Sequence, residues 1–289
     1  LWLNSLNCGF PIFSAAQYGI LNPFHLIFYF LKNQEFAYTI IVLISYIILY
    51  FSSYIYFKYK FKSVIISIFC SVLFSFFGFN LISYLFIPII VAISLFPLSF
   101  YFLERYINTN KKKYLYFITL IISFQIFNGH PQIPFISIIG LLFHTLIMLI
   151  IKKEKISKII YFYIVLILAI ILAFGITAIQ LLPLYHLSKF SVRANIDLSI
   201  SIPLYPHSLL SFLFYNFLGS EAENSFIGPP FGSGNELYLG ILTILFFIIS
   251  IKNLNYKKNI KYYLFLFIFF LIIALGRFSP IYFIIKNIF

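Results

Sequence analysis

Four adjacent residues between two apolar runs have the properties of a binding turn. The stretch FNGHPQIPF at 127–135 contains Gly129, His130, Pro131 and Gln132. Gly129 and Pro131 end a helix. His130 exchanges a proton near neutral pH and suits phosphate contact, and Gln132 offers a carboxamide. The turn predicts either a helix cap with polar tips or a site where His130 and Gln132 face a cavity.

A second polar group follows the apolar run that ends near residue 182. It contains Gln180, Ser191 and Arg193. Because a guanidinium matches phosphate oxygens with two parallel hydrogen bonds, Arg193 predicts a contact with a ligand phosphate or with lipid headgroups. Glu236 opens a later apolar run, where a carboxylate suits the positive end of a helix and has the chemistry of a general base.

The first 35 residues carry further polar groups, among them Asn4 and Gln17. They lack the run of about 20 apolar residues that a membrane span needs, so we expect an outer loop with interfacial helices over 1–35. The seven carboxylates form no Asp-Asp or Glu-x-x-His pattern, and spacing singles out no catalytic residue. No metal cluster or cofactor motif is evident, although a divalent ion on a phosphate is compatible with the sequence.

The composition indicates which class of protein carries these residues. The chain of 289 residues is 62% hydrophobic and 9% charged, whereas soluble domains are about 45–50% apolar and about 25% charged. This predicts an all-α, polytopic integral membrane protein that forms a single domain over 1–289. The net charge of +13 then fits Lys and Arg in cytoplasmic loops better than nucleic-acid binding.

We predict about eight transmembrane helices, the third of which contains Pro88 and Pro97 and can kink there. The region 183–236 is rich in Gly, Pro, Ser and Asn and is expected to be a long outer loop with short helices. The expected spans are 36–56, 63–79, 84–103, 114–128, 133–151, 159–182, 237–251 and 262–276.

The distribution of basic residues predicts the orientation of these helices. Fifteen of the 20 Lys and Arg residues fall in every second loop, which we place on the cytoplasmic side. The segments 1–35, 129–132 and 183–236 then share the outer side. The fifteen are Lys58, Lys60, Lys62, Arg105, Lys111, Lys112, Lys113, Lys152, Lys153, Lys155, Lys158, Lys252, Lys257, Lys258 and Lys261.

Charges are expected at the ends of the spans. Glu104 and Glu154 adjoin basic clusters, and we interpret them as solvated partners of those clusters. The spans themselves hold chiefly Ser, Thr and Tyr as polar residues, which disfavours an ion-coupled transporter. A lipid flippase and a non-catalytic membrane scaffold remain alternatives to an enzyme.

The order of the motifs resembles that of YfhO-type bacterial membrane proteins over nearly the whole chain. Five motifs carry the resemblance. They are WLNSLNCGFPIFSAAQYGILNPFHLI with Trp2, Asn4, Gly9, Pro11, Gln17 and Pro23; GHPQ at 129–132; Gln180, Leu182, Pro183, Ser191 and Arg193, followed by Pro203 and 206–210; ELYLGILTILF at 236–246; and ALGRFSPIY at 274–282.

This family is similar to membrane glycosyltransferases of the GT-C fold. The resemblance implies transfer of a sugar from a polyprenyl-phosphate donor to an extracytoplasmic acceptor, such as lipoteichoic acid or another cell-envelope polymer, at the bacterial cytoplasmic membrane. It implies substrate contacts at Asn4, Gln17, His130, Gln132, Gln180, Ser191, Arg193 and Glu236, with Arg193 against the leaving phosphate. It also places the catalytic carboxylate upstream of Leu1. Because the sequence begins with Leu rather than Met and ends abruptly with KNIF, we expect a fragment that lacks both ends.

Overall fold

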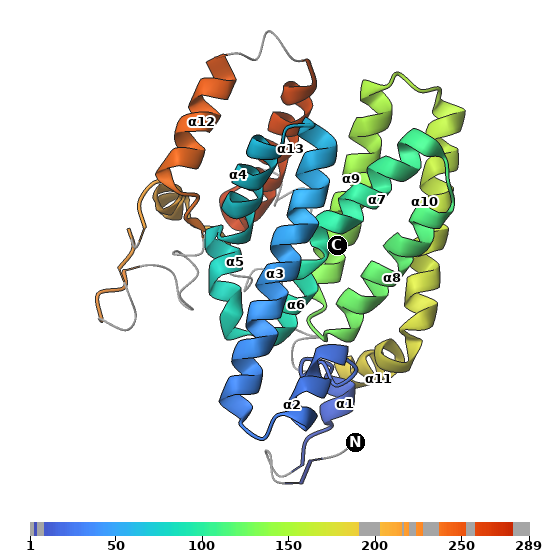
Figure 1. Ribbon diagram of the computed structural model, residues 1–289, viewed down its shortest axis with the longest axis vertical. Coiled ribbons are helices and arrows are strands. Elements are labelled where there is room, and N and C mark those ends of the chain that lie inside the picture. Colours follow the sequence, from blue (N-terminus) through green and yellow to red (C-terminus); the bar gives the residue numbers. More distant parts are fainter. Residues whose placement is uncertain are drawn as a thin grey trace. The chain divides into compact units, whose positions relative to one another are not determined.

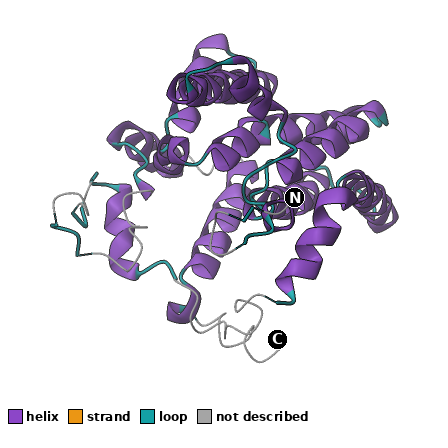
Figure 2. Cartoon of the chain, turned by 90° about the horizontal axis from the view of Figure 1, so that it is seen from below, coloured by secondary structure: helices purple, strands orange, loops and turns teal. Residues whose placement is uncertain are grey.

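The computed structural model describes residues 3–4, 9–190, 203–215, 217–219, 224–227, 237–252 and 258–279. Apart from one isolated bridge between Leu3 and Phe10, these residues form helices, turns and loops, with no strand among them (Figure 2). The chain divides into two compact units, the first made of 1–75 and 83–194 and the second of 76–82 and 195–289. This division leaves the prediction of a single domain untested.

The first unit contains most of the described helices. Short helices precede the bundle, and long helices follow (Figure 1). They are α1 (Ile12–Ala15), a 3-10 turn (Pro23–His25), α2 (Leu26–Phe30), α3 (Gln34–Phe61), α4 (Val64–Ser75), a 3-10 turn (Ser83–Leu85), α6 (Ile87–Ser94), α7 (Phe96–Thr109), α8 (Lys113–Phe127), α9 (Gln132–Ile151), α10 (Ile156–Ile176) and α11 (Ala178–Ser188).

The second unit has fewer described elements, and residues that the structure does not describe separate several of them in the sequence. They are α5 (Gly78–Ile82), a 3-10 helix (Pro206–Phe212), α12 (Ile241–Lys252), α13 (Lys258–Ala274) and a 3-10 turn (Gly276–Phe278). Two backbone hydrogen bonds tie them together: the amide of Gly78 donates to the carbonyl of Tyr238 at 3.1 Å, and that of Leu204 to Ala274 at 2.8 Å.

Four helices of the described chain are long and apolar enough to cross a membrane: Gln34–Phe61, Ile87–Thr109, Gln132–Ile151 and Ile156–Ile176. A fifth is counted if Val64–Ser75 and Gly78–Leu85 form one broken span. The chain therefore has the helix content and apolar helix lengths of an all-α membrane protein. Each of the eight predicted segments overlaps a helix, but several of these helices are shorter than a bilayer requires.

Helix breaks explain where the predicted spans and the structure differ. Pro88 and Pro97 lie in the first turns of α6 and α7, where the missing amide proton costs no helical hydrogen bond. The predicted span 159–182 is interrupted at Thr177, between α10 and α11. Helix α11 then continues to Ser188 with Pro183 inside it, so the region predicted as a long outer loop from residue 183 begins within a helix.

The buried core of the first unit lies among α7, α8, α9 and α10, with Leu103, Ile118 and Leu141 almost fully enclosed. Since lipid is as apolar as these side chains, close packing and hydrogen bonds between helices supply much of the association. The Ser52 hydroxyl of α3 donates to the carbonyl of Ser94 at 2.6 Å, and Thr119 of α8 donates to Ala169 of α10 at 3.0 Å.

The two ends of the first unit differ in chemistry. The loops after α3, α7 and α9 lie at one end, and α1, α2, the 128–131 turn and α11 lie at the other (Figure 1). The first of these ends carries the eleven basic residues from Lys58 to Lys158. We call this the basic end. The alternation that the basic residues predicted is therefore present within this unit.

Candidate functional site

The 128–131 turn ends α8 and starts α9, as the sequence predicts. The amide of Gly129 donates to the carbonyl of Ile126 at 2.9 Å, and Gly129 has a φ of +84°, in the left-handed region. The carboxamide of Asn128 donates to the carbonyl of Phe124 at 2.7 Å and is fully buried. Pro131 directly precedes α9. The turn is thus a helix cap held by its own backbone.

The segment before α2 packs directly on this turn. A Cβ atom added to Gly129 would lie 1.9 Å from the carbonyl oxygen of Ala16, and one added to Gly19 would lie 2.7 Å from that of Asn128. The amide of Gly19 donates to Ala16 at 2.9 Å, which closes the 16–19 turn. Two glycines therefore allow segments more than 100 residues apart in the printed sequence to touch through their backbones.

A pocket of about 180 Å³ lies where these segments meet α11. Its lining is almost entirely apolar, and the one polar side chain in it is that of Gln180. The lining residues are Ala16, Ile126, Gly129, Pro131, Pro134, Phe135, Ile138, Phe174, Gln180, Leu181 and Leu184. Such a pocket fits an apolar ligand portion that brings one polar group.

Gln180 presents an unused acceptor at this pocket. The side chain is only 3% exposed, and its Nε2 donates to the carbonyl of Ile126 at 3.1 Å. Its Oε1 is buried and has no hydrogen-bond partner among the described residues. A buried carboxamide oxygen without a donor costs free energy, so a ligand hydroxyl or N–H at this position would be stabilised.

His130 and Gln132 lie beside the pocket rather than in it. The Nε2 atom of His130 is 3.3 Å from Oε1 of Gln132, and Gln132 is exposed. The pocket lining includes the neighbouring Gly129 and Pro131 but neither of these two side chains. The pair is therefore positioned on the rim of this pocket, and the expectation that both side chains face a substrate cavity stays a prediction.

The other predicted site residues have different positions. Gln17 adjoins Ala16 of the lining and is exposed, and Asn4 is also exposed. Neither contributes to the pocket. Ser191, Arg193 and Glu236 lie outside the described residues. Of the eight predicted positions, the structure brings Gln180 into the pocket and His130 and Gln132 next to it.

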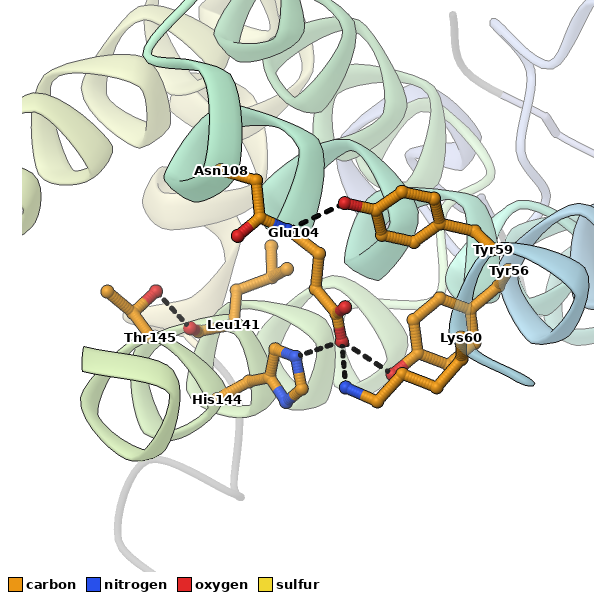
Figure 3. Close-up of polar contacts among 8 residues, drawn as sticks. All are labelled: Tyr56, Tyr59, Lys60, Glu104, Asn108, Leu141, His144 and Thr145. Atoms are coloured by element: carbon orange, nitrogen blue, oxygen red, sulfur yellow. Dashed lines mark hydrogen bonds and ion pairs between the residues drawn. The ribbon is translucent and has the colours of Figure 1, made fainter. Parts of the chain in front are cut away.

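A second polar site lies near the basic end and was not predicted. Glu104 of α7 is 2% exposed, and its Oε1 accepts hydrogen bonds from Lys60 Nζ at 2.6 Å, His144 Nε2 at 2.9 Å and Tyr56 OH at 3.2 Å (Figure 3). We call these four residues the Glu104 cluster. The interpretation of Glu104 as a solvated partner is wrong, because Lys60 and Tyr56 of α3 and His144 of α9 enclose it.

Glu154 behaves as expected. Its carboxylate accepts from Lys158 at 2.7 Å, and both side chains are partly exposed. The signal that distinguishes the two carboxylates is His144, an ionisable residue well inside the predicted span 133–151.

The described residues contain no group of three His, Cys, Asp or Glu side chains that could hold a metal ion. Comparison with protein-family models, with curated proteins and with solved structures found no match.

Proposed function

We propose that the protein is a membrane glycosyltransferase that moves a sugar from a polyprenyl-phosphate donor to an extracytoplasmic acceptor such as a cell-envelope polymer. In this proposal it is an eight-span, GT-C-like protein of the YfhO type in the bacterial cytoplasmic membrane. One observation supports it most. Ala16, the Gly129 turn and Gln180 belong to three separate motifs of the resemblance, and all three line one pocket.

The pocket suits the junction between a lipid and its polar head. Its apolar walls, including Phe135, Phe174 and Leu184, match the first part of an isoprenoid chain. Gln180 Oε1 would accept from a sugar hydroxyl. His130 on the rim has an N–H that can contact the donor phosphate. The pocket lies at the end of the first unit that is opposite the basic loops, which agrees with chemistry on the outer side of the membrane.

The reaction would be a direct displacement at the anomeric carbon. The acceptor oxygen forms the new bond to that carbon while the bond from carbon to the phosphate oxygen breaks, and polyprenyl phosphate leaves. A carboxylate takes the proton of the acceptor hydroxyl. Because phosphate is a good leaving group, no acid need protonate it. The resemblance puts the carboxylate upstream of Leu1 and gives Arg193 the leaving phosphate.

A binding and transfer assay with paired variants tests this proposal. The probe is a polyprenyl-phosphate hexose with a radiolabelled sugar, added to membranes that contain the intact protein. Gln180→Leu has a similar side-chain size but removes the acceptor together with the Nε2 hydrogen bond to Ile126, so transfer should fall at least tenfold, the value of one hydrogen bond of about 1.4 kcal/mol. His130→Ala should weaken binding of the probe.

His186→Ala is the matched control, because His186 is an exposed histidine on α11 that does not line the pocket. It should leave binding and transfer unchanged. Absence of probe binding to the unmodified protein, or equal binding by all three variants and the unmodified protein, would contradict the proposal.

A flippase for lipid-linked sugars is the second candidate, favoured by the Glu104 cluster. The sequence argument against transport rested on spans without charged residues, yet Glu104 and His144 are buried in two of the candidate spans. Ionisable groups within membrane helices commonly mark transport or proton paths. Translocation of a fluorescent lipid-linked sugar across liposomes, without sugar transfer, would favour this function. A scaffold would show neither activity.

A further inference from the structure

Three tyrosine rings surround the guanidinium of Arg105 at the basic end. Its central carbon lies 5.3 Å from the ring centroid of Tyr114, 5.7 Å from that of Tyr59 and 6.0 Å from that of Tyr101. A cation within about 6 Å of a ring centroid is attracted to the face of the ring. Because the rings come from α3, α7 and α8, three helices position this one side chain. We call these four residues the Arg105 cage.

Hydrogen bonds hold the cage further. Arg105 Nε and Nη2 donate to the phenol oxygen of Tyr114 at 3.1 and 2.8 Å. Asn108 Nδ2 donates to the phenol oxygen of Tyr59 at 2.6 Å (Figure 3). An arginine side chain loses rotamer freedom when a ligand immobilises it. Since these contacts already order Arg105, little of that cost remains when it binds a ligand.

One edge of the guanidinium is open. The group has five N–H donors in a planar fork, and Tyr114 takes two of them. Nη1 and the second hydrogen of Nη2 form the other edge and have no partner among the described residues. Arg105 is partly exposed, and Nη1 is not among the buried polar atoms that lack a partner, so this edge reaches the surface of the first unit. Two parallel N–H groups match two oxygens of a phosphate.

The surroundings of the cage carry an excess of positive charge. Lys113 Nζ lies 5.4 Å from the ring centroid of Tyr114, and Lys111 is close enough to act on the same phenol. The two carboxylates of the basic end, Glu104 and Glu154, each already accept a hydrogen bond from a lysine. An anion at the open edge of the guanidinium would therefore be attracted by several cations.

An apolar surface begins at the cage and continues along α8. Phe102 of α7 stacks on Tyr114 and on Phe117, with ring centroids 6.1 and 4.6 Å apart. Phe117 and Leu120, three residues apart and thus neighbours on the helix, are 43% and 57% exposed. Helix α8 leads from the basic end toward the 128–131 turn (Figure 1). A ligand with a phosphate next to hydrocarbon chains matches both the open guanidinium edge and this surface.

We propose that the Arg105 cage binds the phosphate group of an anionic phospholipid, whose acyl chains lie along the exposed apolar face of α8. The open edge of the guanidinium donates two parallel hydrogen bonds to the phosphate oxygens. The apolar face favours a lipid over free phosphate, and the excess of cations favours a headgroup with net negative charge over a zwitterionic one. The site stands independently of the glycosyltransferase proposal, because it lies at the end of the first unit opposite the Gln180 pocket.

Native mass spectrometry of the full chain tests this site. The protein is titrated in detergent with phosphatidylglycerol, and the affinity of the first bound lipid is measured. Arg105→Gln should weaken this affinity by at least about tenfold, since two hydrogen bonds from a charged group are lost. Arg105→Lys keeps the charge but loses the planar fork, and should weaken it by roughly threefold. No sugar donor enters the assay, so its result is separate from that of the transfer assay.

Lys158→Gln is the matched control. It removes one positive charge at the same end, from a lysine that pairs with Glu154, and should leave the affinity unchanged. Equal losses in Lys158→Gln and Arg105→Gln would reduce the effect to general surface charge and overturn the proposal. Equal binding of phosphatidylcholine, or displacement by inorganic phosphate as effective as that by phosphatidylglycerol, would also overturn it. If Arg105→Gln does not fold, the weaker binding by Arg105→Lys is required.

Discussion

Replacing Gly129 by Ala should detach the segment before α2 from the turn at the start of α9. The new Cβ would lie 1.9 Å from the Ala16 carbonyl oxygen, 2.8 Å from the Gly19 nitrogen and 2.9 Å from the Ala16 carbonyl carbon. All three are backbone atoms, so no side chain can rotate away. The left-handed φ of +84° adds about 1–2 kcal/mol for a residue with a Cβ.

The free-energy cost of Gly129→Ala should therefore exceed the contribution of the left-handed φ alone, because the 16–19 turn must also move. Hydrogen exchange read at the amide of Gly19, which donates to Ala16, reports the docking directly. We expect at least a tenfold faster exchange in Gly129→Ala, the equivalent of a loss of about 1.4 kcal/mol. Binding of the lipid-linked sugar should weaken with it, since Ala16 and Gly129 both line the pocket.

Gly175→Ala is the matched control. Apart from its chain neighbours and the backbone of its own helix, no described atom lies within 4 Å of a Cβ added to Gly175, which is an exposed residue of α10. Alanine is preferred over glycine in helices by about 1 kcal/mol, so this variant should be as stable as the unmodified protein or more so. Unchanged exchange at Gly19 in Gly129→Ala would refute the close backbone contact.

Three further predictions concern other parts of the first unit. Asn33→Ala removes the side-chain acceptor for the Phe36 amide at 3.0 Å, which caps the start of α3. Thermal unfolding in detergent should show a loss of about 1 kcal/mol in the free energy of unfolding. An unchanged unfolding transition would contradict this role of Asn33. Glu104→Leu removes the carboxylate that pairs with Lys60, and the free energy of unfolding should fall by about 3 kcal/mol, near the lower limit for breaking a buried pair because Lys60 is partly exposed. Glu104→Gln should cost less, and equal losses in the two variants would exclude a charge effect. Burial lowers the pKa of His25 below its ordinary value of 6.5, so the neutral form is favoured in the folded state and stability should decrease as pH falls below 6.5. His25→Gln should remove this part of the pH dependence. Identical profiles of stability against pH in the variant and the unmodified protein would count against this prediction.

The positions of the helices were largely readable from the sequence. Long apolar runs predicted α9 to within one residue and α3 and α10 to within six residues, because a run of that length and composition has few alternatives to a membrane helix. The Gly129 turn was also predicted, since glycine and proline end helices wherever they occur together. The break at Thr177 was not, although Gly175 lies two residues before it, because a single glycine within an apolar run is tolerated in a membrane helix and does not by itself predict its end.

The contacts that build the two sites were beyond sequence reasoning. Gly129 was read as a helix breaker, but its close approach to Ala16 depends on how the first segment folds back. Glu104 and His144 are 40 positions apart, and only the packing of α7 against α9 brings them to 2.9 Å. Their residue types gave a partial signal, since a His within an apolar span requires a polar partner.

Photo-crosslinking at the pocket tests the central claim most directly. A polyprenyl-phosphate hexose with a diazirine in its first isoprene unit is bound to the full protein in nanodiscs, irradiated and mapped by mass spectrometry. The account predicts labelling of the peptides around Ala16, Pro131 and Leu184, displaced by unlabelled donor and reduced in Gln180→Leu. Labelling confined to other helices, or labelling at these peptides that excess donor does not displace, would contradict it.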